Sequence, residues 1–302
     1  MKEIIASRVI KDTLIKSLTG ICVLLIILII VSILAVVIIG GWENLTWEFL
    51  TEFPEDGMTK GGILPAIVGT ALMTLIMTIA AVPFGTITAI YLAEYASEKS
   101  IFAKTIRFAV KTLAVVPSII FGLFGLGFFI KFVGFKLDNI FYGGELRWGQ
   151  PNILWASLTM ALLTLPVVIV SVEEAIRTIP RDMREASLAL GATRWQTIKK
   201  VVLPGSYTGI LTGTILAISR GAGEVAPILF TGAAYYLAEL PHSLSDQFMS
   251  LGYHIYIMST QSTNVDDTLP IQFATTLVLL LLTFSLSMIA VILRYRIRKK
   301  AI

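Results

Sequence analysis

One pair of charged residues lies deep inside an apolar stretch of this sequence. Arg220 and Glu224 fall within residues 208–237, a segment that is otherwise almost free of charge. About thirteen residues at ~1.5 Å each separate Arg220 from the start of that segment, which places it near the middle of a ~30 Å hydrocarbon core. A cation at that depth costs at least ~2.5–3.5 kcal/mol, so its guanidinium must face a partner or a water-filled path.

Two interpretations of this pair remain open. Glu224 lies at i+4 on the same helical face, so the pair can simply hold the helices together. Alternatively, Arg220 is a step for an anion crossing the membrane. A guanidinium offers a planar fork of donors to an oxyanion, and Glu224 would keep the anion from being trapped.

Other kinds of chemistry find no support in the sequence. It contains no GxxxxGK[ST] nucleotide motif, no HExxH and no Cys/His cluster with metal spacing. Its single cysteine, Cys22, lies in an apolar run and gives no disulfide framework. We therefore expect no catalytic residue, no metal site and no cofactor, and any ATP site must lie on another chain. His242 and His254 are expected in an outer loop.

Composition places these residues in an all-α integral membrane protein. Of the 302 residues, 56% are hydrophobic and only 15% are charged, which is typical of a chain that crosses a bilayer several times. The partner implied is lipid, and the net charge of +4 does not indicate nucleic acid. Six transmembrane helices are predicted, at about residues 21–39, 63–92, 108–130, 153–172, 208–237 and 273–293.

The positions of the basic residues predict the orientation. With the N-terminus inside, nineteen of the 24 Lys and Arg residues fall in the four segments expected to be cytoplasmic. Four fall in the outer loops, and Arg220 lies within a span. Lys and Arg collect on the cytoplasmic side of membrane proteins. Both termini are therefore predicted to be cytoplasmic.

The one long amphipathic stretch, residues 181–204, lies between two predicted spans on the cytoplasmic side. Apolar residues recur at helical spacing on one face, and the other face is basic. Gly191 interrupts the stretch, Thr193 with Gln196 predicts a capping box that opens a second short helix, and Pro204 is expected to end it. The pattern alone is equally typical of a helical hairpin on the membrane surface.

The order Glu185-Ala186-Ser187, Gly191, Val201-x-Leu203-Pro204 resembles the EAA–G–IxLP loop of ABC-importer permeases. Ser187 and Val201 replace the more usual alanine and isoleucine. The resemblance implies a type I ABC importer permease fold in which residues 181–204 form the coupling loop to an ATPase subunit. Within it, the ATPase-coupling residues would be Glu185, Ala186, Gly191, Leu203 and Pro204.

Three further stretches are similar to the A-type permease (PstA) of phosphate-specific ABC importers: IYLAEYA at 90–96, LAVVPSIIFGLF at 113–124 and SRGAGEVAPILFTG at 219–232. The similarity runs from about Gly61 to the end, with Val225 where threonine is more usual. It implies that inorganic phosphate crosses the cytoplasmic (inner) membrane along a path that includes Arg220 and Glu224. The chain is then a transport subunit and not an enzyme.

The resemblance also implies an organisation and a set of partners. Residues 1–62 would form the cytoplasmic tail, first span and outer loop, and residues 63–302 the permease core. A second phosphate permease subunit would complete a heterodimer. Two ATP-binding subunits would bind on the cytoplasmic side and an extracytoplasmic phosphate-binding protein on the outer face.

Three alternatives stay open at this point. The chain can be the permease for another oxyanion, such as sulfate or molybdate. It can be a membrane scaffold or signalling subunit, although a scaffold has no reason to bear the cost of Arg220. A membrane enzyme would need a nucleophile with a paired base, and the sequence offers none.

Overall fold

The computed structural model describes residues 2–55, 58, 60–97, 99–262 and 265–300, and it is helical almost throughout. Within these described ranges, six helical segments are long and apolar enough to cross a membrane, which confirms the six-span, all-α prediction. They are Lys11–Asn44, Leu64–Tyr95, Ser118–Phe141, Ile153–Arg177, Arg194–Gly221 and Thr268–Arg296.

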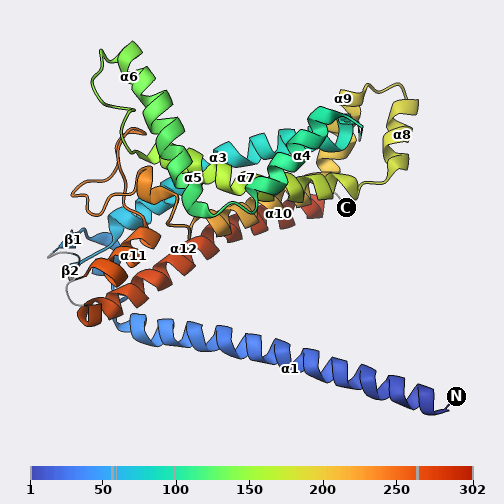
Figure 1. Cartoon of the computed structure of the whole chain (residues 1–302), viewed down its shortest axis with the longest axis horizontal. Coiled ribbons are helices and arrows are strands. Elements are labelled where there is room, and N and C mark those ends of the chain that lie inside the picture. The colour runs from blue at the N-terminus through green and yellow to red at the C-terminus, as the bar shows by residue number, and fades with distance from the viewer. Residues whose placement is uncertain (1, 56–57, 59, 98, 263–264, 301–302) are drawn as a thin grey trace.

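The helices and strands follow one another along the chain in Figure 1. The first half contains α1 (Lys2–Gly41), η1 (Trp42–Asn44), α2 (Trp47–Thr51), β1 (Pro54–Glu55), β2 (Lys60–Gly61), α3 (Leu64–Ile90), η3 (Tyr91–Tyr95), α4 (Ile101–Leu113), α5 (Ser118–Phe124), η4 (Gly125–Gly134) and α6 (Phe135–Phe141). The second half contains α7 (Ile153–Arg177), α8 (Arg181–Ala189), α9 (Arg194–Thr197), η5 (Ile198–Val202), α10 (Leu203–Gly221), η6 (Ile228–Phe230), α11 (Leu251–Gln261) and α12 (Val265–Lys300). Segments η3, η4 and η5 are π-helical.

The core is built around α7, which packs between α3 and α10 (Figure 1). Small residues let these helices approach closely. A Cβ on Gly85 of α3 would meet Val168 of α7, and one on Gly209 of α10 would meet Ala175. Close approach through small residues is how helices associate in a bilayer, where the hydrophobic effect does not drive them together. This packing fixes α10, and with it Arg220, against α7.

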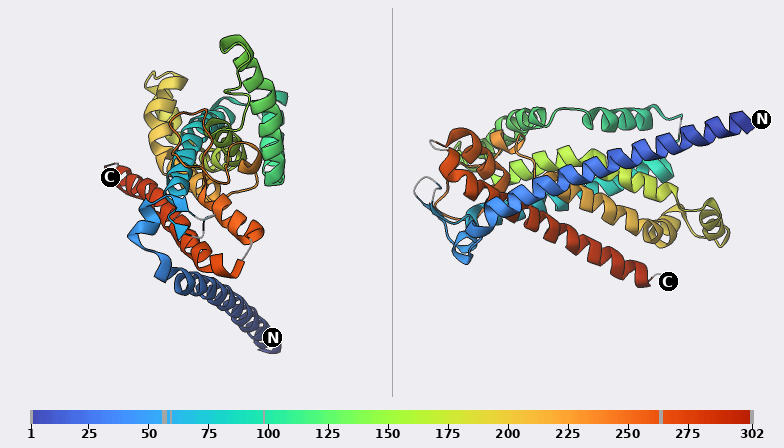
Figure 2. Two further views of the ribbon diagram at one scale, coloured as in Figure 1. Left: turned by 90° about the vertical axis from the view of Figure 1, so that its left-hand side faces the viewer. Right: turned by 90° about the horizontal axis from the view of Figure 1, so that it is seen from below.

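Helix α1 stands apart from this core (Figures 1 and 2). The most apolar part of its span has no buried residue. It meets the rest of the chain near its C-terminal end, where Gly40 and Gly41 lie against Phe273 and Ala274 of α12. Both ends of the chain lie at the same end of the molecule as α8 and α9, and the β1–β2 hairpin lies at the opposite end (Figures 1 and 2).

The third span differs from the prediction of residues 108–130. Helix α4 ends at Leu113, and the span begins at Ser118, after Pro117. A proline has no N–H to continue a helix, and α4 carries too many basic residues for the membrane interior. The span therefore lies further along the chain and ends at Phe141.

The fifth span also differs from the predicted continuous helix over 208–237. It begins earlier, at Arg194, and its helix ends at Gly221. Residues 222–250 are irregular apart from η6 and an isolated β-bridge between Ala233 and Phe248. Their backbone finds partners across the core: Thr231 O accepts from Asn152 N at 2.9 Å, and Asp246 O accepts from Ile153 N at 2.8 Å. Irregular backbone at membrane depth is tolerated where protein groups satisfy it in this way.

The helix also continues through Pro204, which was expected to end it. The π segment Ile198–Val202 comes just before, and its hydrogen bonds run five residues back, as from Leu203 N to Ile198 O. Pro204 then stands in the first turn of α10, where the missing N–H of proline costs little.

Candidate functional site

Arg220 and Glu224 form a loose ion pair at the end of α10. Arg220 Nε lies 3.7 Å from Glu224 Oε1, beyond hydrogen-bonding distance, and the two side chains are 37% and 27% exposed. Among the described residues no hydrogen bond from the guanidinium is found. Arg220 thus keeps donors that are free to bind an anion.

The surroundings of Gly221 place this pair near the middle of the bundle. A Cβ on Gly221 would meet the sulfur of Met77, which lies about halfway along α3, and would also approach Met160 of α7. The mid-membrane position expected of Arg220 is therefore consistent with the packing. The difference is that Arg220 stands in the last turn of a helix rather than within a continuous one. The negative end of the helix dipole favours a cation there.

The turn after α10 is packed on one side and open on the other. Gly252, in the first turn of α11, approaches Val225 and the Gly223 carbonyl, whereas a Cβ on Gly223 would meet nothing within 4 Å. Ser219 Oγ lies 3.2 Å from Ser287 Oγ of α12. The Cβ position of Gly223, three residues after Arg220, is therefore open. In the part of the chain that the structure describes, no group of His, Cys, Asp and Glu residues could hold a metal ion.

The coupling stretch folds as two short helices joined by a turn. Gly191 has φ +85°, a conformation that glycine adopts without steric cost. Thr193 Oγ1 accepts from Gln196 N at 3.3 Å, and Gln196 Oε1 accepts from Thr193 N at 2.8 Å. This confirms the predicted capping box and the second helix, α9.

The five predicted coupling residues do not lie on one surface. Glu185, Ala186 and Gly191 are exposed at the tip formed by α8 and the turn. Leu203 instead packs against the core at the base of α10, and Pro204 follows it. Apolar side chains are also exposed at the tip. They belong to the apolar face that the sequence predicts for this stretch, and they are Met183, Leu190 and Trp195.

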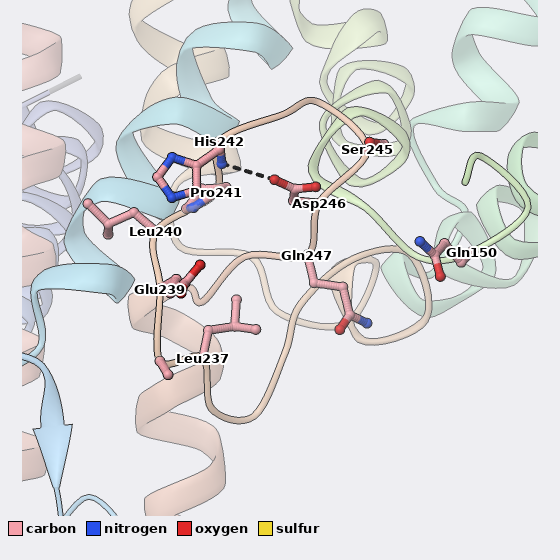
Figure 3. A pocket seen from close by; sticks show the side chains of 10 residues that line it. Gln150, Leu237, Glu239, Leu240, Pro241, His242, Ser245, Asp246 and Gln247 are labelled. Atoms are coloured by element: carbon pink, nitrogen blue, oxygen red, sulfur yellow. Dashed lines mark hydrogen bonds between the residues drawn. The ribbon is translucent and has the colours of Figure 1, made fainter. Parts of the chain in front are cut away.

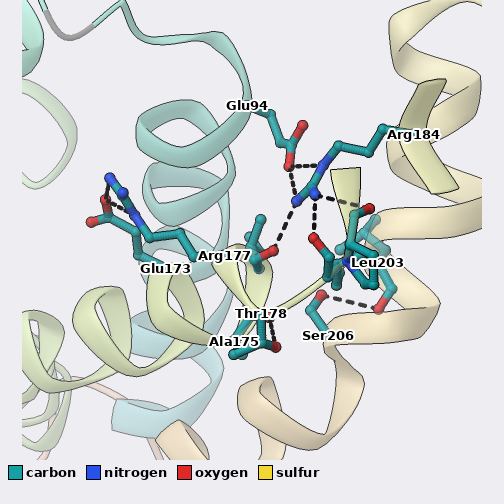
Figure 4. A network of polar contacts seen from close by, with 11 residues as sticks. Glu94, Glu173, Ala175, Arg177, Thr178, Arg184, Leu203 and Ser206 are labelled. Carbon is teal, nitrogen blue, oxygen red and sulfur yellow. Dashed lines mark hydrogen bonds and ion pairs between the residues drawn. The ribbon is translucent and has the colours of Figure 1, made fainter. Parts of the chain in front are cut away.

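An arginine that sequence reasoning did not single out holds α8 in place (Figure 4). Arg184 donates from Nε and Nη2 to Glu94 Oε1 at 3.0 and 2.8 Å. It also donates to the carbonyls of Ile176 and Ile179, at 2.8 and 2.5 Å. The Arg184 and Glu94 side chains are only 19% and 13% exposed. Glu94 lies in the IYLAEYA stretch and Arg184 directly precedes the Glu185-Ala186-Ser187 sequence, but nothing in the sequence indicates that residues 90 positions apart are paired.

A second set of ion pairs lies beside it. Glu173 of α7 is 2.7 Å from Arg107 of α4 and 2.9 Å from Arg177 (Figure 4 shows Glu173 and Arg177). Arg107 also donates to the Leu92 carbonyl at 2.8 Å. These contacts tie α4 to the ends of α3 and α7, so the end of the bundle next to α8 is crosslinked by charged groups.

At the other end of the molecule, the loop after η6 forms a cavity of about 530 Å³, lined by Gln150 and by residues 237–242 and 245–247 (Figure 3). Asp246 accepts from the backbone N–H of His242 at 3.0 Å, and His242 is exposed, as expected of a loop residue. His254 differs from the expectation, because it lies in helix α11 with its side chain buried.

Comparison with known proteins agrees with this architecture. Residues 81–299 match the family described as binding-protein-dependent transport system inner membrane component. YqgI of Bacillus subtilis, a probable ABC transporter permease protein, is 34% identical over 225 residues, which are 74% of this chain and 71% of YqgI. The phosphate transport system permease proteins PstA of Mycobacterium leprae and Yersinia pestis are each 36% identical, over 66% and 70% of this chain. The chain spans 62% of each of these two PstA proteins.

Solved structures share the fold at low sequence identity. A bacterial alginate ABC transporter, in complex with an alginate-bound periplasmic protein, superimposes with a TM-score of 0.64 at 14% identity and covers 93% of both chains. The MetNI methionine ABC transporter gives 0.55 at 17% identity, over 78% of this chain and 95% of that one. The fold is that of type I ABC importer permeases. The chain therefore belongs to the binding-protein-dependent transport system inner membrane component family, as a multi-pass inner-membrane transport subunit that leaves ATP hydrolysis to a separate chain.

Proposed function

We propose that this chain is a permease subunit of an ATP-driven importer that moves inorganic phosphate across the cytoplasmic membrane. The observation that carries the proposal is Arg220. Its guanidinium is near the middle of the bundle, only loosely paired with Glu224 at 3.7 Å and more than one-third exposed. Relatives named as phosphate permeases, 36% identical to this chain, support phosphate as the anion.

The chemistry of the pair suits a transport step. A guanidinium binds a phosphate through two parallel charge-assisted hydrogen bonds, and it stays charged at any physiological pH. Glu224 competes for the same cation, so the anion is held weakly enough to leave. An arginine held tightly by a carboxylate would not offer this exchange, which is why the 3.7 Å separation matters.

The remaining parts of the proposal concern the partners. Two ATP-binding subunits would bind on the cytoplasmic side. One of them would bind the tip of α8 and α9 through Glu185, Ala186 and the apolar side chains around Gly191, with Leu203 and Pro204 connecting the tip to α10. A second phosphate permease subunit would complete the path as a heterodimer, and a phosphate-binding protein would bind at the opposite end. Both termini would be cytoplasmic, since they share an end of the molecule with α8 and α9.

The test is uptake of labelled phosphate into proteoliposomes that contain the whole transporter. We expect ATP-dependent uptake that excess sulfate leaves unchanged and that falls by about ten- to a hundredfold in Arg220→Gln, because removing a charge-assisted contact costs ~1.5–3 kcal/mol. Arg147→Gln is the matched control, since Arg147 stacks on Tyr142 in the loop after α6, far along the chain from the path.

Each alternative predicts a different result. Competition by sulfate or molybdate would replace phosphate by another oxyanion and leave the importer intact. Normal uptake by an assembled Arg220→Gln transporter would make the arginine structural. A transporter that moves no oxyanion at all would contradict the proposed function and favour a scaffold or signalling subunit.

A further inference from the structure

The side chain of Arg184 connects α8 to the helical bundle. Its guanidinium binds the Glu94 carboxylate and, at the same time, the carbonyls of Ile176 and Ile179 at the end of α7. With the side chain 19% exposed and its partner 13% exposed, water competes little for these contacts. Such largely buried, multiply bonded arginines are held in one geometry.

The contact is the main polar tie between α8 and the bundle. Among the described residues, the other side-chain hydrogen bond from α8 to a residue outside it and its flanking turn joins Ser187 Oγ to Thr197 Oγ1 at 2.9 Å, within the two-helix tip itself. Most of the remaining surface of α8 is exposed, and among the residues described none of its side chains is fully buried. Besides the chain itself and its packing on α9 and η5, α8 is therefore connected to the bundle by the contacts of Arg184.

Glu94 connects this point to the helix that touches the transport site. It lies in η3, the π segment that continues α3 without a break in helical backbone. Further along α3, Met77 contacts Gly221, the residue next to Arg220. One continuous helical segment thus joins Arg184 on α8 to the neighbour of the proposed phosphate site.

We infer that the Arg184–Glu94 ion pair is the strut that transmits movement of α8 to α3. The two residues pair with each other at the α8 end of the bundle and not with Arg220 or Glu224, so we treat both as positioning residues for energy coupling. The inference rests on the proposed role of α8 as the element that binds the ATPase. It assigns a role to the glutamate of the IYLAEYA stretch and to the arginine that precedes the EAS sequence.

The test compares Glu94→Gln, Arg184→Gln and the double variant in the whole reconstituted transporter. The measured quantity is phosphate imported per ATP hydrolysed. We expect each single variant to keep hydrolysing ATP while this ratio falls about tenfold, the usual size of a coupling between sites. The double variant should be no worse than either single one, because both remove the same strut.

Two controls separate coupling from folding. Glu174→Gln changes an exposed acidic residue at the end of α7, outside the 181–204 loop, and should leave the ratio unchanged. Glu94→Asp keeps the charge and should restore most of it. A strut that only holds the fold together would instead lower the yield of assembled transporter and leave the ratio per complex normal, which would overturn the inference. A normal ratio in Glu94→Gln, or additive losses in the double variant, would do the same.

A second measurement tests the strut whatever the substrate is. Spin labels at Ile87 of α3 and Ile292 of α12, both exposed, are placed in a Cys22→Ser chain, and the distance between them is measured with and without trapped ATP. We expect a shift in the native chain that is absent in Glu94→Gln. If the shift persists in the variant, or is missing in the native chain, the strut is wrong. If the shift depends on Glu94 but phosphate is not imported, only the proposed substrate is wrong.

Discussion

At the scale of a single residue, the buried imidazole of His254 makes the stability of the folded chain depend on pH. Its side chain is 3% exposed, and neither ring nitrogen finds a hydrogen-bond partner among the residues described. Helix α11 lies outside the six spans, and desolvation by burial lowers the pKa of His254 to about 4. The folded state therefore holds this residue neutral where the unfolded chain, with an ordinary histidine pKa, already binds a proton.

The sign follows from this difference. Between the unfolded pKa of about 6.5 and the folded pKa of about 4, the unfolded state binds more protons, so stability falls as the pH is lowered. We expect a loss of about 2 kcal/mol between pH 7 and pH 5. Thermal unfolding of the detergent-solubilised chain measures it. His254→Leu should remove most of the pH dependence, whereas His242→Leu, an exposed control, should not. An equally steep dependence in His254→Leu would assign it to other groups.

The environment of some single residues could be predicted from the sequence and that of others could not, and the difference has a physical reason. Arg220 stood out because a lone cation in an apolar stretch is costly whatever surrounds it. The Arg184–Glu94 pair did not, since each residue is ordinary in its own segment and the pairing depends on tertiary contact over 90 positions. His254 was expected in a loop because it falls between the fifth and sixth predicted spans, and the packing of α11 against α12 and α3 buries it instead.

At the scale of the elements, sequence patterns predicted correctly those features that depend only on residues close together in the chain. The capping box at Thr193 and the turn at Gly191 depend on residues a few positions apart, and the structure has both. The end of α10 was missed because hydropathy stays high past Gly221. An apolar chain without helix is possible there only because Asn152, Ile153 and Phe248 supply distant backbone partners.

The turn between α8 and α9 offers a prediction that separates conformation from packing. A Cβ on Gly191 would meet nothing within 4 Å, so any effect of a side chain must come from its φ of +85°. A residue other than glycine costs about 1–2 kcal/mol in this region, and a β-branched one more. We expect Gly191→Val to leave the transporter assembled while phosphate imported per ATP hydrolysed falls.

Gly191→Asn is the matched control, because asparagine adopts positive φ far more readily than valine. It should keep most of the coupling between hydrolysis and uptake. If both variants lose coupling equally, the side chain itself obstructs the ATPase surface and the turn conformation is not the cause. If both retain it, the tip of α8 and α9 is not the coupling element.

At the scale of the whole molecule, the chain is an open structure that presents much apolar surface. Exposed large side chains cover α1, one side of α3 and the C-terminal half of α12. In a bilayer this surface meets lipid or a partner subunit, and hydropathy predicted it well. The division into residues 1–62 and 63–302 stays a prediction. Phe49 lies in one cluster with Ile63 and Ala274, so part of the first segment packs on the second.

Helix α1 leads to the last prediction, because its contacts are confined to one end. Its apolar span is unburied, and Gly41 is where it presses on Phe273 and Ala274. Replacing residues 21–36 by a Leu/Ala helix of equal length should leave the melting temperature of the isolated, detergent-solubilised chain unchanged. Gly41→Leu should lower it by several degrees, since overpacking costs about 1–3 kcal/mol. If the melting temperature of the chain with the exchanged helix is as low as that of Gly41→Leu, α1 packs on the core along its length. If the chain with the exchanged helix has a normal melting temperature but no longer assembles with a second permease, the exposed face of α1 binds the partner and does not stabilise this chain's own fold.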